Sequence, residues 1–174
     1  MKGIIFSEPL FHAVVEGRKT QTRRMRVAKE ILSGQEVEFS PRYKAGETVY
    51  LKEPYFIDIK GDVCYKYEPQ ELLIPMCTKN VKWQNKLFMP ARYARYFIEI
   101  TDLRCERLQQ ITDSDCVKEG ICINPNYDED VKNGLRISSS SYIVNYAELI
   151  DTINGKGTWE SNPYVWVYSF KLLK

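Results

Sequence analysis

The most constraining feature of the sequence is a change of phase in the strand-like segment YFIEITDLRCERL, residues 96–108. Its apolar residues fall on even positions up to Ile100 and on odd positions from Leu103 onward. Because successive side chains of a strand point to opposite faces, this pattern requires one extra residue near Thr101 and Asp102. We predict a β-bulge there, which bends a strand in the way that small barrels require.

Other segments also have the pattern of strands. GIIF at 3–6 is typical of a short buried strand, and TVYLKE at 48–53 alternates with strand period. YFIDIK and DVCYKY flank Gly61 with matching alternation, which predicts a hairpin. The last segment, YVWVYSFKLL, is apolar on both faces at first, as a central or barrel-closing strand would be.

Three helices are predicted from apolar residues at helical spacing. The first follows a Ser7 cap and stops at Gly17, the second runs from Thr112 to Glu119 and stops at Gly120, and the third ends at NGKG near residue 154. Strands of reversed direction, one bulge and about three helices predict an α+β fold, namely a small mixed β-barrel decorated by helices. We expect a single domain over 1–174, with insertions near 68–88 and 121–137.

Composition excludes several classes of protein. Charged residues make up 28% and hydrophobic residues 44% of the chain, which is typical of a soluble globular domain. No apolar run approaches the length of a membrane helix, so we expect a cytoplasmic protein with no membrane partner. Five cysteines without a C-x-x-C pair, and His12 as the one histidine, predict reduced thiols and no metal site. Phosphate-loop and dinucleotide-binding patterns are absent, so no cofactor is expected, and the oligomeric state stays open.

Positive charge is concentrated in the segment GRKTQTRR, residues 17–24, and just after it. No acid occurs from Gly17 to Lys29, a stretch that holds Arg18, Lys19, Arg23, Arg24, Arg26 and Lys29. A second acid-free stretch, 86–97, adds Arg92 and Arg95 beside Tyr93. Guanidinium groups bind phosphate and aromatic rings stack on bases, so these stretches together would bind single-stranded RNA.

The acids are expected away from these basic stretches, at Asp113, Asp115, Glu119 and 128–130. The molecule would then have a basic region and an acidic region, although its net charge is only +2. The alternative is that the arginines form a solvated face without a ligand.

Four ordered stretches resemble one known family: the N-terminal segment ending in GRKTQTRR, then GETVYLKEPY, FMPARYARYFIEITDLRCERLQQITDSDCVKEG and YAELIDTINGKGTWESNPYVWVYSFK. Together they cover well over half of the chain. They are similar to ASCH-domain proteins of the PUA-like superfamily, of the longer type often encoded with phage genes. The resemblance implies a pseudo-barrel with a cleft facing the GRKT segment, which binds RNA or a modified nucleoside.

The same resemblance implies a set of candidate catalytic residues. Some family members are similar to ribonucleases, and a shorter relative hydrolyses the acetyl amide of acetylcytidine with a lysine, a threonine and a glutamate. Matched by motif, these are Lys19, Thr22 and Glu119, with Glu53 as an alternative carboxylate. The chain departs from the longer relatives in KEPY and MPARYAR, where Pro54 and Tyr93 would reshape the cleft wall and alter the substrate.

The chemistry of these residues leaves two assignments open. Thr22 needs a base to act as a nucleophile, and Lys19 could serve if neighbouring arginines lowered its pKa. If Glu119 contacts Lys19, the lysine stays charged and stabilises an oxyanion, and the carboxylate becomes the general acid and base. In an ideal strand Lys19 and Thr22 point to opposite faces, so a shared pocket requires a turn just after Gly17.

Three functions are therefore compatible with the sequence. The first is a domain that binds RNA or a modified nucleoside in a basic cleft around GRKTQTRR, with or without hydrolysis. The second is a small hydrolase, either an acetylcytidine-type amidohydrolase or a ribonuclease. The third is a phage-accessory module for protein interaction, which an apolar patch of Trp83 beside Ile74 and Met76 would favour.

Overall fold

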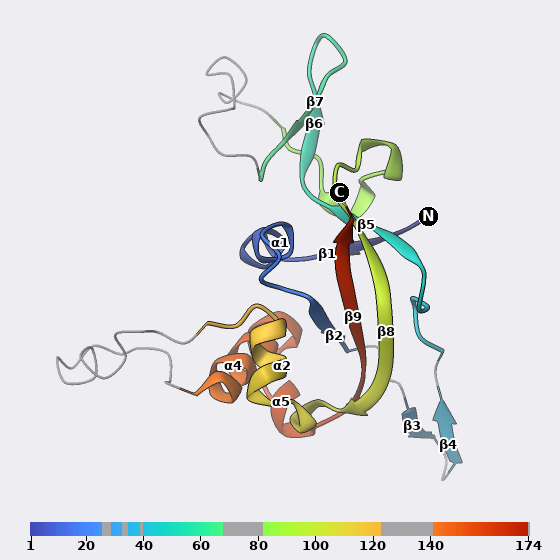
Figure 1. The fold of residues 1–174 in the computed structure, drawn as a ribbon, viewed down its shortest axis with the longest axis vertical. Helices are drawn as coiled ribbons and strands as arrows, with labels where there is room; N and C mark the ends of the chain where they lie inside the picture. Colours follow the sequence, from blue (N-terminus) through green and yellow to red (C-terminus); the bar gives the residue numbers. More distant parts are fainter. Residues whose placement is uncertain (26–28, 33–34, 39, 68–81, 123–140, 174) are drawn as a thin grey trace, which may run out of the picture.

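The main sheet has five strands in the order β1-β5-β8-β9-β2 (Figure 1). The computed structural model describes residues 1–25, 29–32, 35–38, 40–67, 82–122 and 141–173. β1 runs parallel to β5, and the other neighbours are antiparallel. The bounds of the strands are β1 (Lys2–Ile5), β2 (Gln21–Arg24), β5 (Thr48–Lys52), β8 (Phe97–Arg107) and β9 (Tyr164–Leu173). The predicted α+β class is confirmed.

The predicted closed barrel does not form among the described strands, because β1 and β2 remain the two edges of an open sheet. A barrel would need a further backbone ladder between the two edges. Instead, a side chain crosses from one edge to the other, where Nη2 of Arg24 donates to the carbonyl of Ile5 at 2.7 Å. The chain segments beside this opening line two cavities described below.

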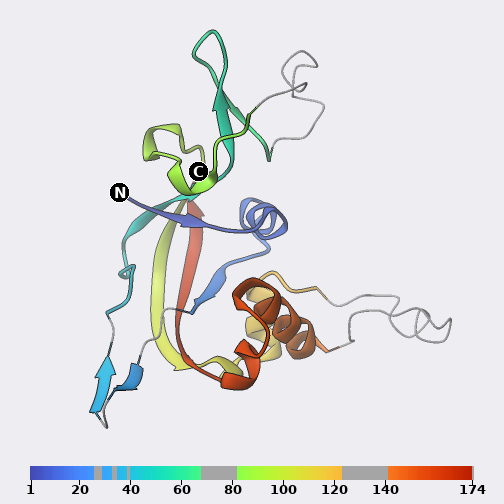
Figure 2. The ribbon, with the colours of Figure 1, turned by 180° about the vertical axis from the view of Figure 1, so that it is seen from behind.

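β8 and β9 form the long bent pair that runs through the molecule (Figure 2). Ile100 pairs with Phe170 and Asp102 pairs with Ser169, which leaves Thr101 as the extra residue. The predicted bulge is therefore confirmed at the predicted place. β9 lies between β8 and β2, and its residues 165–168 are all buried, as expected of a central strand.

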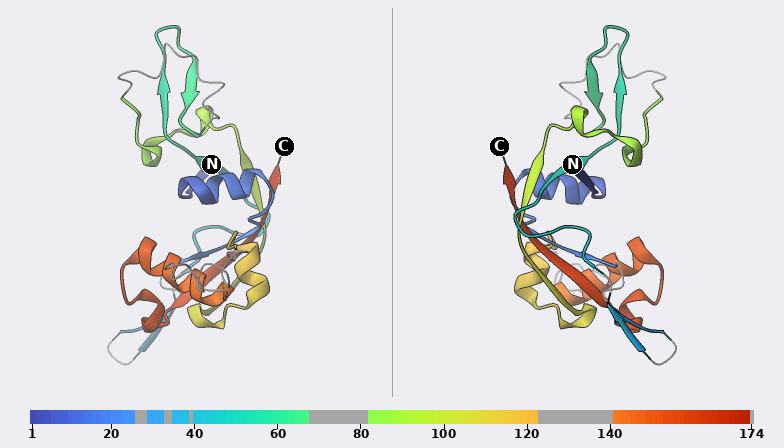
Figure 3. Two further views of the ribbon diagram at one scale, coloured as in Figure 1. Left: turned by 90° about the vertical axis from the view of Figure 1, so that its left-hand side faces the viewer. Right: turned by 90° about the vertical axis from the view of Figure 1, so that its right-hand side faces the viewer.

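Three α-helices begin and end close to the predicted residues, namely α1 (Glu8–Val15), α2 (Asp113–Lys118) and α4 (Tyr142–Asn154). Gly17 and Gly120 follow the first two helices with φ of 76° and 86°, values that favour glycine. α5 (Thr158–Ser161) was not predicted. α2, α4 and α5 lie together beside one half of β8 and β9, and α1 lies near β1 (Figure 3). No helix in the described part of the chain is long and apolar enough to cross a membrane.

Two small hairpins extend from the main sheet at opposite ends of the molecule (Figure 1). β6 (Tyr55–Ile57) pairs with β7 (Val63–Tyr65), which confirms the hairpin predicted around Gly61. The hairpin of β3 (Lys29–Leu32) and β4 (Gln35–Glu38) was not predicted. Short 3-10 turns complete the described structure, namely η1 (Lys86–Phe88), η2 (Ala91–Tyr93) and η3 (Leu108–Gln110).

Most of the two predicted insertions lies outside the described residues, which omit 68–81 and 123–140. Ile74 and Met76 of the predicted apolar patch are among the omitted residues. Trp83 is described, and its ring packs edge-on against Phe56 with centroids 5.1 Å apart. Trp83 is half-buried there, so part of its surface is already covered by the chain itself.

Two hydrophobic clusters support the molecule. One joins α1 to the sheet through residues such as Phe11, Val49 and Ile100, and the other joins α2 and α4 to β9 through residues such as Cys116 and Ile150. Several polar side chains are buried beside these apolar ones, which is rare unless they are paired. They are Lys19, Gln21, Thr22, Arg23, Glu53, Asp115 and Glu119.

Candidate functional site

A sharp turn after α1 places Lys19 next to Thr22. Gly17 adopts a positive φ directly after the helix, and the backbone N–H of Lys19 donates to the carbonyl of Ala13 at 2.8 Å. The chain thus folds back on α1 before β2 begins at Gln21. Lys19 and Thr22 line the same cavity. The turn that the sequence argument required after Gly17 is confirmed.

Glu119 is brought to Lys19 by the end of α2. The backbone N–H of Thr20 donates to the carbonyl of Lys118 at 2.8 Å, which joins the turn to the last residue of the helix. Gly120 then passes so close that a Cβ there would lie 3.3 Å from the Cβ of Lys19. The Nζ of Lys19 donates to Oε2 of Glu119 at 2.6 Å and to its backbone carbonyl at 2.7 Å. The two side chains are only 1% and 5% exposed, so this is a buried ion pair.

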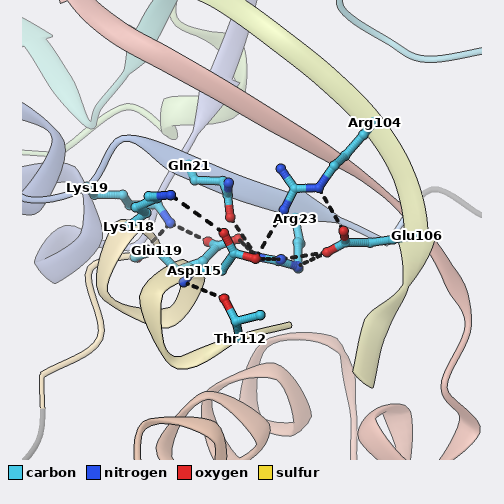
Figure 4. Close-up of polar contacts among 9 residues, drawn as sticks. All are labelled: Lys19, Gln21, Arg23, Arg104, Glu106, Thr112, Asp115, Lys118 and Glu119. Atoms are coloured by element: carbon cyan, nitrogen blue, oxygen red, sulfur yellow. Dashed lines mark hydrogen bonds and ion pairs between the residues drawn. The ribbon is translucent and has the colours of Figure 1, made fainter. Parts of the chain in front are cut away.

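Arg23 is surrounded by hydrogen-bond acceptors on the same side of β2 (Figure 4). Its Nη2 donates to Glu106 at 2.6 Å and to Asp115 at 3.0 Å. Its Nη1 donates to Gln21 at 2.9 Å and to Glu119 at 3.3 Å. Burial alone would lower the pKa of Arg23, but the surrounding carboxylates raise it instead. Its charge is therefore fully engaged inside the protein.

Arg104 extends this network at the surface. Its guanidinium donates to Glu106 at 2.7 Å and to Asp115 at 3.1 Å. Burial would raise the pKa of Asp115, but the guanidinium groups of Arg23 and Arg104 lower it overall. The cations and carboxylates of the network alternate, so it is close to neutral as a whole.

The pKa of Lys19 is lowered from that of an ordinary lysine. The largest cause is burial, and the contact with Glu119 opposes the shift without cancelling it. Arg24 and Arg23 lower the pKa further, but less than burial does. The sequence left two opposing influences on this pKa open, and both are present, with burial as the largest cause.

The cavity beside the ion pair has a volume of about 340 Å³. One wall is apolar and comes from α4, with Leu149, Ile150 and Ile153, and from Leu10 of α1. Ile5, Phe6 and Met25 add further apolar surface, and the remaining lining residues are polar, namely Ser7, Lys19, Thr22, Arg23, Arg24, Lys86, Glu119, Tyr146 and Asn154. Within the described residues the hydroxyl of Thr22 makes no hydrogen bond. An apolar wall facing a few polar groups is the usual character of a small-molecule site.

Tyr146 also lines this cavity, and it was not among the predicted site residues. It is 1% exposed, and its hydroxyl has no hydrogen-bond partner among the described groups. Burial raises the pKa of this phenol strongly, and the nearby charge of Glu119 acts in the same direction. The group therefore stays protonated and can donate a hydrogen bond. No helical periodicity could have revealed this, because the ring itself packs as an apolar residue.

Of the predicted RNA-binding residues that the structure describes, only Arg23 and Arg24 line the cavity of Lys19. Arg18 is exposed and bonds to Glu16, its near neighbour in sequence. Arg92 lies over the ring of Tyr93, with 4.8 Å from the guanidinium carbon to the ring centre. Neither Arg92 nor Tyr93 lines the cavity of Lys19, and Arg26 lies outside the described residues.

Arg95 and Glu53 form a separate pair. The guanidinium of Arg95 donates to both carboxylate oxygens of Glu53 at 2.8 Å each. Glu53 does not line the cavity, so Glu119 is the carboxylate that accompanies Lys19. The expected separation of acids from arginines is wrong, because Asp115 and Glu119 pack directly against Arg23. Strand β2 and helix α2 are distant in sequence, and only the fold brings their charges together.

Among the described residues, no group of three or more histidine, cysteine or acidic side chains could hold a metal ion. Burial raises the pKa of the Cys116 thiol to about 11, so this cysteine is a poor nucleophile. Comparison with protein-family models, with curated proteins and with solved structures finds no match to this chain.

Proposed function

We propose that this chain binds a modified nucleoside, free or within RNA, in the cavity beside Lys19, and hydrolyses an amide on it. The supporting observation is the buried Lys19–Glu119 ion pair, which opens with the hydroxyl of Thr22 into a cavity of about 340 Å³. The resemblance to ASCH-domain, PUA-like proteins also supports the proposal, because a shorter relative hydrolyses acetylcytidine with a lysine, a threonine and a glutamate that match these three residues.

The lining of the cavity favours a flat and largely neutral ligand. Leu149, Ile150 and Ile153 offer an apolar wall to a heterocyclic ring, and Tyr146 offers a hydrogen-bond donor. The charges of Lys19 and Arg23 are already matched by carboxylates, so they have little left for a phosphate. A base with an acylated amino group suits such a surface better than a bare anion.

The proposed reaction uses three side chains that line the cavity. Thr22 Oγ1 attacks the carbonyl carbon of the acetyl amide, and Glu119 accepts the hydroxyl proton. The Lys19 ammonium donates a hydrogen bond to the oxyanion that develops on the carbonyl oxygen. The C–N bond then breaks as the leaving nitrogen takes the proton from Glu119. Water hydrolyses the acetyl-threonine ester, which releases acetate and restores Thr22.

The test is an assay of N4-acetylcytidine hydrolysis, in which the release of cytidine is measured over time. Thr22→Val keeps the shape of the side chain but removes the nucleophile, so we expect turnover to fall about 100-fold or more. Thr22→Ser is the matched control, because it keeps the hydroxyl and should retain much of the activity. Thermal unfolding of both variants should resemble that of the wild type.

Two results would separate hydrolysis from binding. If the wild type turns over acetylcytidine no faster than Thr22→Val does, the hydrolytic step is wrong. If the nucleoside still binds in that case, with the affinity reduced by Lys19→Met, the binding function stands alone. Absence of both binding and turnover would contradict the proposal, and a parallel assay with labelled RNA would then test the ribonuclease alternative.

A further inference from the structure

A second cavity adjoins the first on the other side of Arg24. It has a volume of about 580 Å³, and it shares Ile5, Arg24 and Met25 with the cavity of Lys19. Three of its lining residues are cations, namely Arg24, Arg42 and Lys52, and none of its described lining residues is acidic. The second cavity thus differs from the first, where Glu119 is among the lining residues.

Among the described residues, the side chains of the three cations donate hydrogen bonds only to backbone carbonyls. Arg24 donates to Ile5 at 2.7 Å, and Lys52 donates to Leu87 at 2.7 Å. Arg42 reaches the carbonyl of Gly3 at 3.4 Å. In the described part of the chain none of the three takes part in an ion pair. Their charges remain unmatched, unlike those of Lys19 and Arg23.

Arg24 carries the strongest indication of a missing anion. Its Nε is buried and has no hydrogen-bond partner in the described structure. A guanidinium held away from water without a bound counter-ion costs free energy. Burial lowers the pKa of Arg24 and the charge of Arg42 adds to this effect, while Tyr43 and Glu119 oppose the shift without cancelling it. An anion bound here would offset the cost of burying the guanidinium.

The tyrosines of the second cavity are already occupied, which favours an anion over a second base. Tyr43 donates its hydroxyl to the carbonyl of Gly3 at 3.0 Å, and Tyr168 accepts the backbone N–H of Arg42 at 3.0 Å. The two rings pack edge to face with centroids 5.3 Å apart. Both residues are buried, so neither offers a free face for stacking. Among the described polar lining residues, the cations are the ones left to bind a ligand.

We propose that the second cavity binds the phosphate that is linked to the nucleoside in the first cavity, with Arg24 between the two. The natural ligand is then a nucleotide unit of an RNA strand rather than a free nucleoside. This inference rests on the proposed function for the identity of the ligand, but not for the existence of an anion site. A guanidinium group can donate two parallel hydrogen bonds to two oxygens of one phosphate. Arg24 and Arg42 are therefore suited to binding a phosphate.

The experiment compares the affinity for N4-acetylcytidine with that for a trinucleotide carrying the same base in the middle. At low salt we expect the trinucleotide to bind at least about 10-fold more tightly, with an affinity that falls with salt by about 0.7 logarithmic unit per phosphate contact. The double variant Arg42→Gln/Lys52→Gln should remove most of this advantage. Lys156→Gln is the matched control, because Lys156 is exposed and lines neither cavity.

Pyrophosphate provides a probe that does not depend on the nucleoside. It should bind to the wild type and bind more weakly to Arg42→Gln/Lys52→Gln. If this holds but acetylcytidine neither binds nor reacts, the proposed function fails and the anion site stands. If acetylcytidine reacts but the trinucleotide gains nothing over it, the anion site is wrong and the proposed function stands. Equal loss of pyrophosphate binding in Lys156→Gln would also overturn the anion site.

Discussion

Arg23 and Arg24 are neighbours in β2, yet their surroundings are opposite. Arg23 donates to four side chains, three of them carboxylates, and its side chain is fully buried. Arg24 donates to one backbone carbonyl and has an unpartnered Nε. Successive side chains of a strand face opposite ways, so one arginine meets α2 and the end of β8 while the other meets β1. Adjacent cations therefore acquire different roles, one structural and the other open to a ligand.

The comparison also explains why the density of arginines in the sequence overstates the charge available for binding. Arg18, Arg23 and Arg95 each bond to a carboxylate. The second cavity has no acid among its described lining residues. Its cations, Arg24, Arg42 and Lys52, come from three separate segments of the chain. Two of these three were not among the predicted binding residues, because Arg42 and Lys52 lie outside the acid-free stretches.

The sharpest way to test the comparison is to replace each arginine of β2 with methionine. Arg23→Met leaves three buried or half-buried carboxylates short of a partner, and we expect it to lower the free energy of unfolding by about 3–5 kcal/mol. Arg24→Met removes an unmatched cation and one hydrogen bond, so its effect should stay within about 1 kcal/mol. Urea unfolding of both variants gives the two values. If both variants lost the same free energy of unfolding, the two arginines would contribute equally to stability, which would contradict the difference in their surroundings.

A smaller effect is expected from pH on the network around Arg23. The pKa of Asp115 is held below the ordinary aspartate value of 3.8 in the folded protein, so the folded state binds this proton less readily than the unfolded chain. Its contribution to stability is fully present above 3.8 and is lost as the pH falls through the folded pKa. Unfolding measured from pH 7 downward should show this loss in the wild type. Asp115→Asn should have a lower free energy of unfolding at neutral pH, and that free energy should fall less as the pH is lowered.

An unchanged acid dependence in Asp115→Asn would mean that other carboxylates carry the effect. Glu99→Gln is a suitable control, because Glu99 pairs with Lys171 at the surface, where ion pairs contribute little. That variant should follow the wild type throughout.

The sequence predicted the features that depend on neighbours along the chain. The bulge at Thr101 and the helix ends at Gly17 and Gly120 all follow from local patterns, and all are found. Whether the sheet closes depends on pairing between β1 and β2, which no local pattern encodes. The barrel prediction failed for this reason.

The candidate site was predicted in part. The contact between Lys19 and Glu119 joins residues 100 positions apart, and only the family resemblance suggested it. The residue patterns alone placed Glu119 among acids remote from the arginines. In the described structure the hydroxyl of Tyr146 and the Nε of Arg24 lack hydrogen-bond partners. Such a lack can be seen only in the folded structure, where the neighbours of each group are known.

The smallest predicted effect concerns two buried tyrosines on the two sides of β2. Within the described residues the hydroxyl of Tyr146 has no hydrogen-bond partner beside Arg23, whereas that of Tyr43 donates to the carbonyl of Gly3 beside Arg24. Tyr43→Phe should lower the free energy of unfolding by about 1 kcal/mol, since it loses a buried hydrogen bond. Tyr146→Phe should leave stability unchanged or slightly raised, but weaken nucleoside binding by roughly 2- to 12-fold, the equivalent of one hydrogen bond. Thermal unfolding and ligand titration of both variants give the two readings. If Tyr146→Phe were instead as destabilising as Tyr43→Phe with no change in binding, the phenol of Tyr146 would belong to the packing of α4 and not to the ligand site.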